Sequence, residues 1–196
     1  MDISELAEKA FTYAEYRELL NEFVEDQENK TEAQLKMLPY IVTNINLMET
    51  WDQAAALTEE MKAAVESWAP ATWLVLTEGW CGDAANIIPL FQKIADFSKG
   101  KIKLRLLLRD ENTALMDQYL TDGGRAIPKV IIYDEAFREL ANWGPCPAVL
   151  HAQKKPWKEE AGKDFQILIR KVNEWYEADQ CITTQAEILA LQHKRQ

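Results

Sequence analysis

Cysteine is scarce in this sequence: among 196 residues there are three, Cys81, Cys146 and Cys181. An odd and widely spaced set does not form the disulfide framework of a small secreted protein. Reduced thiols are typical of the cytoplasm, so we expect a cytoplasmic protein whose cysteines are free. Histidine is scarcer still, because only His151 and His193 occur, and neither has cysteines or carboxylates at the spacing of a zinc site. We therefore expect no metal.

Long hydrophobic runs are absent as well. No stretch reaches about 18 consecutive apolar residues, the length that a membrane-spanning helix needs, and the acidic segment 1–16 lacks the apolar core of a secretory signal. Basic residues are outnumbered, with 22 Lys and Arg against 32 Asp and Glu and a net charge of −10. Because an acidic chain repels polyanions, we expect neither nucleic acid nor a membrane surface as a partner. No glycine-rich phosphate loop joins a predicted strand to a helix, so we expect no cofactor.

Glycine is missing from residues 1–70, although the whole chain has seven. Within this segment, apolar residues recur at helical spacing over 3–27 and over about 32–49. Thr58 is placed to cap a third helix, which Pro70 ends. The sequence therefore predicts an all-helical N-terminal extension that packs on the rest of the protein.

From residue 72 onward, short apolar runs typical of β-strands alternate with helical patterns. The predicted order is a strand at 72–77, a helix at 83–100, a strand at 101–110, a short helix at 112–120, strands at 128–134 and 137–143, a polar connection at 150–163 and a helix at 164–178. A strand–helix–strand unit builds a parallel pair, and two strands joined by a short turn build a hairpin. The predicted fold class is therefore α/β, with a central mixed sheet (βαβ plus ββα) flanked by helices.

These patterns divide the chain into three parts. The helical extension covers 1–70, the α/β domain covers 71–178, and a C-terminal helical tail covers 179–196. Cys181 lies in the tail, and we expect it to be a structural residue.

The stretch TEGWCGDAANIIPL, residues 77–90, places Cys81 between a predicted strand and the start of a predicted helix. The N-terminus of a helix carries partial positive charge and unpaired N–H groups. Both stabilise a thiolate, which is the reactive form of cysteine. Cys81 is therefore the candidate nucleophile.

Several further motifs follow this stretch in a fixed order. Trp-Cys-Gly around Cys81 is followed by Pro89, then by the segment GGRAIPKVIIYD, and then by NWGP. In this order the motifs resemble the thioredoxin family over roughly residues 72–145. More narrowly, the chain resembles bacterial thioredoxin-like proteins that have a Trp-Cys-Gly-Asp-Ala site and a helical N-terminal extension.

The resemblance implies a thioredoxin-like sheet and a cis peptide bond between Ile127 and Pro128. In the family this loop faces the nucleophilic cysteine and holds an extended substrate by its backbone. A flat substrate platform that receives an extended peptide near a disulfide is thereby implied around Cys81. Its residues are Trp80, Gly82, Asp83, Ile127, Pro128, Trp143 and Gly144.

The sequence departs from the family where the second thiol would stand. Ala84 occupies the position of the resolving cysteine, so a dithiol cycle through a C-x-x-C pair cannot close. Val75 and Leu106 stand where the family often has a buried Asp and a buried Lys that serve that cysteine. Because the second thiol and its proton relay are absent together, the sequence indicates a site organised around one thiol.

Three neighbouring residues have two interpretations each. Asp83 either stabilises the first turn of the helix or exchanges a proton with Cys81, whose thiolate a nearby carboxylate disfavours. Arg125 is either a surface residue or an anion contact, for example for the carboxylate of a small thiol. Cys146 is either a small residue in a proline-rich turn or a resolving cysteine, which requires its Cα within about 7 Å of that of Cys81.

These observations lead us to expect a monothiol thiol–disulfide oxidoreductase. Cys81 would attack the disulfide of a protein or of a low-molecular-weight thiol, and an external thiol would resolve the mixed disulfide. The alternative is a non-catalytic binding module or a redox sensor that uses the platform around Pro128. The pattern leaves the oligomeric state open.

Overall fold

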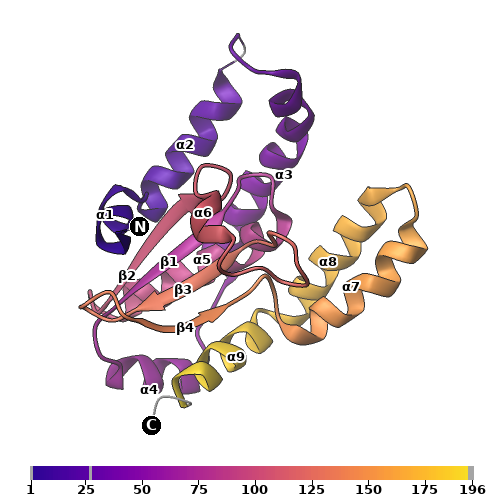
Figure 1. Cartoon of the computed structure of the whole chain (residues 1–196). Helices are drawn as coiled ribbons and strands as arrows, with labels where there is room; N and C mark the ends of the chain where they lie inside the picture. The colour runs from indigo at the N-terminus through magenta and orange to yellow at the C-terminus, as the bar shows by residue number, and fades with distance from the viewer. Residues whose placement is uncertain (1, 27, 194–196) are drawn as a thin grey trace.

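A computed structural model of the chain describes residues 2–26 and 28–193, and a four-stranded sheet lies at its centre (Figure 1). The strands β1 (Ala71–Thr77), β2 (Ile102–Leu108), β3 (Lys129–Tyr133) and β4 (Glu139–Trp143) are arranged in the order β2-β1-β3-β4. β1 and β2 are parallel, whereas β3 is antiparallel to both β1 and β4. This mixed sheet, with helices packed on it, confirms the predicted α/β fold.

The inner strand β1 is buried along its whole length. Its Val75 pairs directly with Leu106 of β2, and both side chains are fully buried. Val75 and Leu106 are therefore neighbours inside the core, and neither side chain carries a group that can accept or donate a proton.

Helix α5 (Gly82–Phe97) follows β1 and carries the start of the site. Ten of its residues are buried, Pro89 among them, because the helix lies against the sheet. Phe91 of α5 makes edge-to-face contacts with Trp73 of β1 and Trp143 of β4, with ring centroids 5.6 and 6.0 Å apart. These aromatic contacts fix the helix on the sheet.

The prediction of a single helix over 3–27 is wrong, because the chain breaks into α1 (Ile3–Lys9) and α2 (Tyr13–Glu25). Between them, Phe11 pairs with Leu106 at the edge of the sheet, through N–H···O bonds of 2.9 and 2.8 Å. Two backbone hydrogen bonds to β2 cover part of an otherwise open strand edge, which helical periodicity alone does not reveal.

The other N-terminal helices are α3 (Glu32–Ala54), which extends beyond the predicted 32–49, and α4 (Glu59–Ser67). Thr58 caps α4 as predicted, because its hydroxyl accepts a hydrogen bond from the Met61 N–H at 3.1 Å. Figure 1 shows α2 and α3 projecting together at one end of the molecule, while α4 lies at the opposite end. The helical extension is thus confirmed, and it wraps around the sheet.

The prediction of a polar connection at 150–163 is also wrong. Residues Ala148–Ala161 form helix α7, which pairs with α8 (Phe165–Asp179). Within α7 only Leu150 and Ala161 are buried, and the helix contains Pro156. A helix that buries so few of its residues shows little apolar periodicity in its sequence.

Two short segments complete the fold. Helix α6 (Thr113–Met116) is shorter than the predicted 112–120. In the tail, α9 (Ile182–His193) buries Ile188 and Gln185, and the Gln185 side chain accepts from the Thr58 N–H and donates to the Ala56 carbonyl. The tail therefore contributes to the core. Within the residues that the structure describes, no helix combines the length and apolar content that crossing a membrane requires.

Candidate functional site

Cys81 is the N-cap residue of α5, at the point where β1 ends. Its side chain is only 7% exposed, and its Sγ donates to the Ile127 carbonyl oxygen at 3.2 Å. The backbone N–H groups of Asp83 and Ala84 also lie against the sulfur. The thiol is therefore held between the first turn of α5 and the loop that precedes β3.

Burial is the main reason why the pKa of Cys81 is raised, and the carboxylate of Asp83 adds to it. The N–H groups of Asp83 and Ala84 and the ammonium of Lys154 act in the opposite direction. The net result is a pKa of about 12. At neutral pH the thiol is accordingly protonated, despite its place at a helix N-terminus.

Asp83 joins three helices beside Cys81. Its carboxylate pairs with the Lys154 ammonium from α7 and accepts the Tyr176 hydroxyl from α8 at 3.0 Å. No local pattern indicates either partner, since they lie 71 and 93 residues further along the chain. Asp83 thus ties the start of α5 to the α7–α8 pair, in addition to its place in the first helical turn.

Cys146 lies beside the same charged pair. Burial, followed by the Asp83 carboxylate, raises the pKa of Cys146 to about 12, whereas Lys154 lowers it. Cys81 and Cys146 therefore share Asp83 and Lys154 as neighbours, although both thiols are free. Cys181 is buried under α5, where its Sγ lies 3.5 Å from the Asn86 carbonyl oxygen.

The loops around Pro128 and Gly144 are in direct contact. The Ile127–Pro128 peptide bond is cis, and so is Gly144–Pro145. Gly144 has φ +119°, and a Cβ at this position would lie 2.1 Å from the Pro128 carbonyl oxygen. Only glycine fits so close an approach without displacing the loop before β3.

Trp143 takes a different place from the one implied by the family resemblance. Its side chain is 8% exposed, packs against Phe91, and donates Nε1–H to the Glu187 carboxylate at 2.6 Å. The same carboxylate accepts the Ala148 N–H at 2.8 Å, which fixes the start of α7. The structure therefore buries Trp143 between α5 and α9 and does not expose it as part of a substrate platform.

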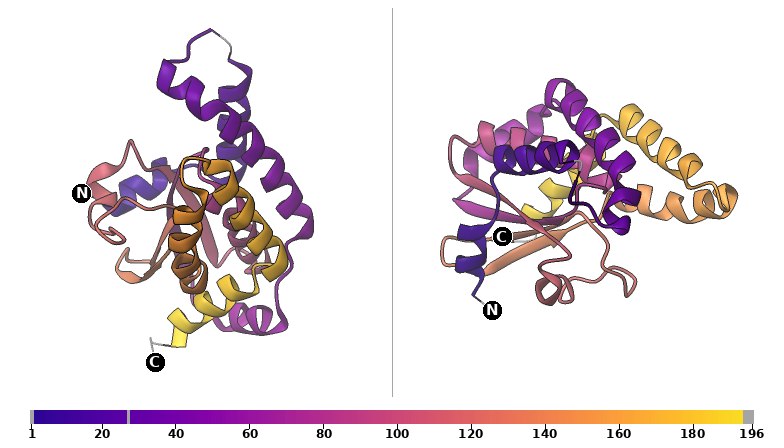
Figure 2. Two further views of the ribbon diagram at one scale, coloured as in Figure 1. Left: turned by 90° about the vertical axis from the view of Figure 1, so that its right-hand side faces the viewer. Right: turned by 90° about the horizontal axis from the view of Figure 1, so that it is seen from above.

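The surface around Cys81 is a cleft of about 620 Å³ and not the flat platform that the resemblance implies. One wall comes from α3, a second from α7 and α8, and the floor from residues 80–83 at the start of α5 and from the loop residues 125–127. Helices α7 and α8 run side by side as a pair (Figure 2). Of the predicted platform, the cleft is lined by Trp80, Gly82, Asp83 and Ile127.

Buried asparagines hold these walls together, and sequence reasoning missed them. Asn86 accepts from Trp51 Nε1 of α3 at 2.8 Å, and its amide donates to the Gly82 carbonyl at 2.8 Å and to Asn173 of α8 at 3.0 Å. Asn44 of α3 donates to the Gly79 carbonyl at 2.9 Å. The sequence does contain one indication of this network: Asn86 is a polar residue on a helix face that is otherwise apolar.

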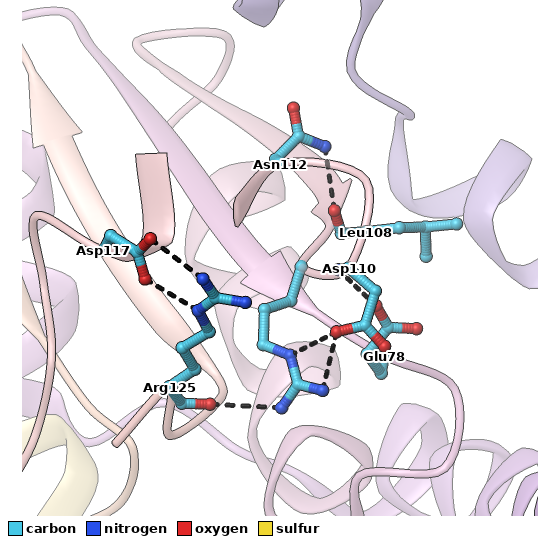
Figure 3. Close-up of polar contacts among 7 residues, drawn as sticks. Glu78, Leu108, Asp110, Asn112, Asp117 and Arg125 are labelled. Carbon is cyan, nitrogen blue, oxygen red and sulfur yellow. Dashed lines mark hydrogen bonds and ion pairs between the residues drawn. The ribbon is translucent and has the colours of Figure 1, made fainter. Parts of the chain in front are cut away.

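Two arginines line the cleft opposite these helices. The Arg109 guanidinium lies 4.9 Å from the centre of the Trp80 ring, and its Nη1 donates to the Arg125 carbonyl at 3.1 Å. Arg125 makes two hydrogen bonds to Asp117, of 2.7 and 2.9 Å, as Figure 3 shows. Arg125, the predicted anion contact, therefore lines the cleft, and its guanidinium is already paired with the Asp117 carboxylate.

No cluster of metal ligands accompanies the site. Among residues 2–26 and 28–193, no three His, Cys, Asp or Glu side chains come together in a way that could hold a metal ion. His151 lines the cleft, and its Nε2 lies 3.6 Å from the Asp122 carboxylate.

Known proteins resemble this chain in sequence over its central part. A family model described as Thioredoxin matches residues 30–158. Thioredoxin 1 of Nostoc sp. and the thioredoxin of Synechocystis sp. are each 32% identical over 77 residues, which are 39% of this chain and 61% of each relative. The chloroplastic M-type thioredoxin of Pisum sativum is 29% identical over 105 residues, 54% of each chain. The matches thus span about three fifths of the cyanobacterial proteins and about half of the plant protein.

Solved structures resemble nearly the whole chain. A protein of unknown function from Pseudomonas aeruginosa superimposes with a TM-score of 0.55 at 17% identity and covers 91% of this chain and 98% of its own. An HIV epitope-scaffold also has a TM-score of 0.55, at 15% identity, and covers 94% and 99%. At these identities the likeness concerns the fold alone, and it includes the added helices.

Proposed function

This chain belongs to the thioredoxin family, and from that premise we propose that it is a ligand-binding member whose Cys81 thiol stays protonated inside the binding cleft. The observation that carries the proposal is the state of this thiol. It is 7% exposed, donates to the Ile127 carbonyl, and has a pKa raised to about 12 by burial and by Asp83.

A protonated thiol is a poor nucleophile. Because burial raises the pKa of Cys81 to about 12, the thiolate is a very minor species at pH 7. Because the thiolate is the species that attacks a disulfide, exchange at Cys81 is slow in this conformation. The absence of a cysteine at Ala84 further supports a role other than dithiol turnover.

The size and construction of the cleft support ligand binding. Its volume of about 620 Å³ falls within the range of about 300–1,000 Å³ that small-molecule sites have. Its walls are joined by buried hydrogen bonds of Asn86 and by the contacts of Asp83 with Lys154 and Tyr176. Walls joined in this way restrict access to Cys81 by a folded protein, whereas a small molecule fits between them.

The experiment is a pH profile of Cys81 alkylation by iodoacetamide in the full chain that carries Cys146→Ala and Cys181→Ala. We expect a rate at pH 8 far below that of free cysteine, with about a tenfold rise per pH unit up to pH 10, because the rate follows the thiolate fraction. The same protein in urea should react at the rate of free cysteine. A plateau with a midpoint near or below pH 8 in the folded protein would overturn the proposal.

A second candidate function is monothiol exchange, favoured by the groups that face the sulfur. The N–H groups of Asp83 and Ala84 and the Lys154 ammonium all stabilise a thiolate. In this reaction the Cys81 thiolate attacks a disulfide of a protein or of a low-molecular-weight thiol, forms a mixed disulfide and releases one thiolate. An external thiol then attacks the adduct and regenerates Cys81.

Glutathione disulfide distinguishes the two functions. Monothiol exchange requires that one glutathionyl group is added to Cys81 within minutes at neutral pH, as seen by mass spectrometry of the Cys146→Ala, Cys181→Ala chain. The ligand-binding function requires that the folded protein stays unmodified over the same period, while the urea-unfolded control is modified.

A further inference from the structure

The charge of the cleft differs from that of the chain as a whole. The protein has a net charge of −10. Among the described residues, three cationic side chains nevertheless line the cleft, Arg109, Arg125 and Lys154, against a single carboxylate, Asp83. Asp83 already accepts from Lys154 and Tyr176, one through each of its oxygens. A second anion entering the cleft therefore meets positive charge, and a cation does not find a free carboxylate.

The two arginines form the cationic side of the cleft. Arg109 bonds to Asp110 and Arg125 bonds to Asp117, and neither of these aspartates lines the cleft. Arg125 uses Nε and Nη2 for Asp117, and in the described part of the chain its Nη1 has no protein acceptor. The hydrogen bond from Arg109 Nη1 to the Arg125 carbonyl keeps the two residues together. A carboxylate or sulfonate is the complement of such a guanidinium.

The opposite walls are mainly apolar, although the polar residues Thr43, Asn44, Gln166 and Asn173 also line them. Helix α3 contributes Pro39 and Tyr40, and helix α8 contributes Leu168, Ile169 and Val172. The cleft thus has a cationic side and an apolar side at once, which is the arrangement that binds an amphiphilic small molecule.

A second hollow, of about 450 Å³, lies on the other side of Trp80 and provides a contrast. Its lining includes the carboxylates of Glu78, Asp110 and Glu111, and no Lys or Arg of the described residues lines it. Trp80 belongs to both hollows. The positive lining is consequently a property of the Cys81 cleft and not of every depression on this surface.

We propose that the Cys81 cleft binds a small organic anion, namely a carboxylate or sulfonate attached to an aromatic or branched aliphatic body. The acid group lies against Arg125 and Arg109, and the body lies against α3 and α8. This inference rests on the proposed ligand-binding function and specifies the chemical class of the ligand.

Three probes with the same aromatic body and different charge test the proposal: naphthoate, naphthalenemethanol and naphthylmethylammonium. Binding to the full chain is measured by calorimetry, and its location by the slowing of Cys81 alkylation in the Cys146→Ala, Cys181→Ala chain. We expect naphthoate to bind at least about tenfold more tightly than the alcohol, since hydrogen bonds to charged groups are the stronger ones. The ammonium probe should bind most weakly, and added salt should weaken naphthoate binding.

Two variants locate the anion. Arg125→Gln should weaken naphthoate binding by about tenfold and leave the alcohol unchanged, because only the charged contact is lost. Glu111→Gln, in the second hollow, should change neither by more than about twofold, and it serves as the matched control. Circular dichroism and urea unfolding show that both variants are folded.

The outcomes separate this inference from the function on which it rests. If the alcohol or the ammonium probe protects Cys81 as well as naphthoate does, or if Arg125→Gln leaves naphthoate affinity unchanged, the anion assignment is wrong and the ligand-binding function stands. If naphthoate does not bind at millimolar concentration, the assignment is likewise wrong. If no probe protects Cys81 and its alkylation has a midpoint near pH 8, the proposed function itself falls.

Discussion

The strand–helix core and the helices packed around it place opposite demands on the same thiol. The core, formed by β1–β4 and α5, puts Cys81 at a helix N-terminus, where the N–H groups of Asp83 and Ala84 favour a thiolate. The surrounding helices α3, α7 and α8 wall in the cleft, and burial is the largest cause of the raised pKa. The family framework therefore positions the cysteine, whereas the packing around it sets its protonation. Fold alone therefore does not assign the chemistry.

The largest expected effect concerns the junction between α3 and α5. Trp51 of α3 is 4% exposed and donates Nε1–H to Asn86. We expect Trp51→Ala to lower the free energy of unfolding by about 3–5 kcal/mol, because a cavity opens and Asn86 loses a partner. Urea denaturation measures the change. Val42→Ala, on the same helix at a site 40% exposed, should stay within about 0.5 kcal/mol. If Trp51→Ala lowered the free energy of unfolding as little as Val42→Ala, α3 would not be part of the core.

A slightly smaller effect is expected at Gly144, in the loop that directly follows β4. Gly144→Ala should destabilise the protein by about 2–4 kcal/mol, since φ is +119° and the new Cβ meets the Pro128 carbonyl oxygen at 2.1 Å. Gly123→Ala is the matched control, because Gly123 has φ +76° but open space around its Cβ position. It should cost about 1–2 kcal/mol from backbone strain alone. If urea unfolding shows that both substitutions lower the free energy of unfolding equally, the contact of the new Cβ with Pro128 adds nothing to the backbone strain.

The pH dependence of stability tests which state of Cys81 the surrounding helices favour. Because the folded pKa is about 12 and the unfolded value is about 8.5, the protonated thiol stabilises the fold fully below pH 8.5. That stabilisation declines as the pH rises from 8.5 towards 12, by about 1.4 kcal/mol per pH unit. Between pH 9 and 11, Cys81→Ala should reduce the slope of unfolding free energy against pH by about this amount. Parallel slopes in the two proteins would mean that Cys81 ionises in the folded state with an ordinary pKa.

The smallest effect is expected where α8 meets the start of α5. Tyr176→Phe removes the hydroxyl that donates to Asp83 and should lower the free energy of unfolding by about 1 kcal/mol. Tyr40→Phe removes a hydroxyl from the α3 wall of the same cleft, for which the described residues show no hydrogen bond, and should change little. Indistinguishable unfolding curves for the two variants would indicate that the Tyr176 contact does not tie α8 to the site.

Prediction from the sequence succeeds where local patterns and tertiary structure agree. The four strands, α5 and the cap at Thr58 follow from apolar periodicity and from residues adjacent in the chain. It fails where a distant contact decides the local structure. The break between α1 and α2 depends on Phe11 pairing with Leu106, and α7 is held as a helix largely by its neighbours, with only Leu150 and Ala161 buried.

The site shows the same division. The position of Cys81 between a strand and a helix identifies it from the sequence. The sequence does not identify Lys154, Tyr176 and Asn86 as residues of the same site. Trp143 was expected beside Cys81, yet its indole N–H pairs with Glu187, 44 residues further along the chain. A charged or aromatic side chain pairs with whatever the fold brings near it, and no local pattern records that partner.

By itself, the sequence determined the order of the strands and helices of the core, the position of one thiol at the start of a helix, and the lack of a second thiol at Ala84. Only the tertiary structure decided that this thiol lies in a walled cleft, beside Asp83 and Lys154, and is protonated at neutral pH. The physical reason is that strands and helices form from local periodicity, whereas burial and electrostatic fields depend on groups that approach one another in space from remote parts of the chain.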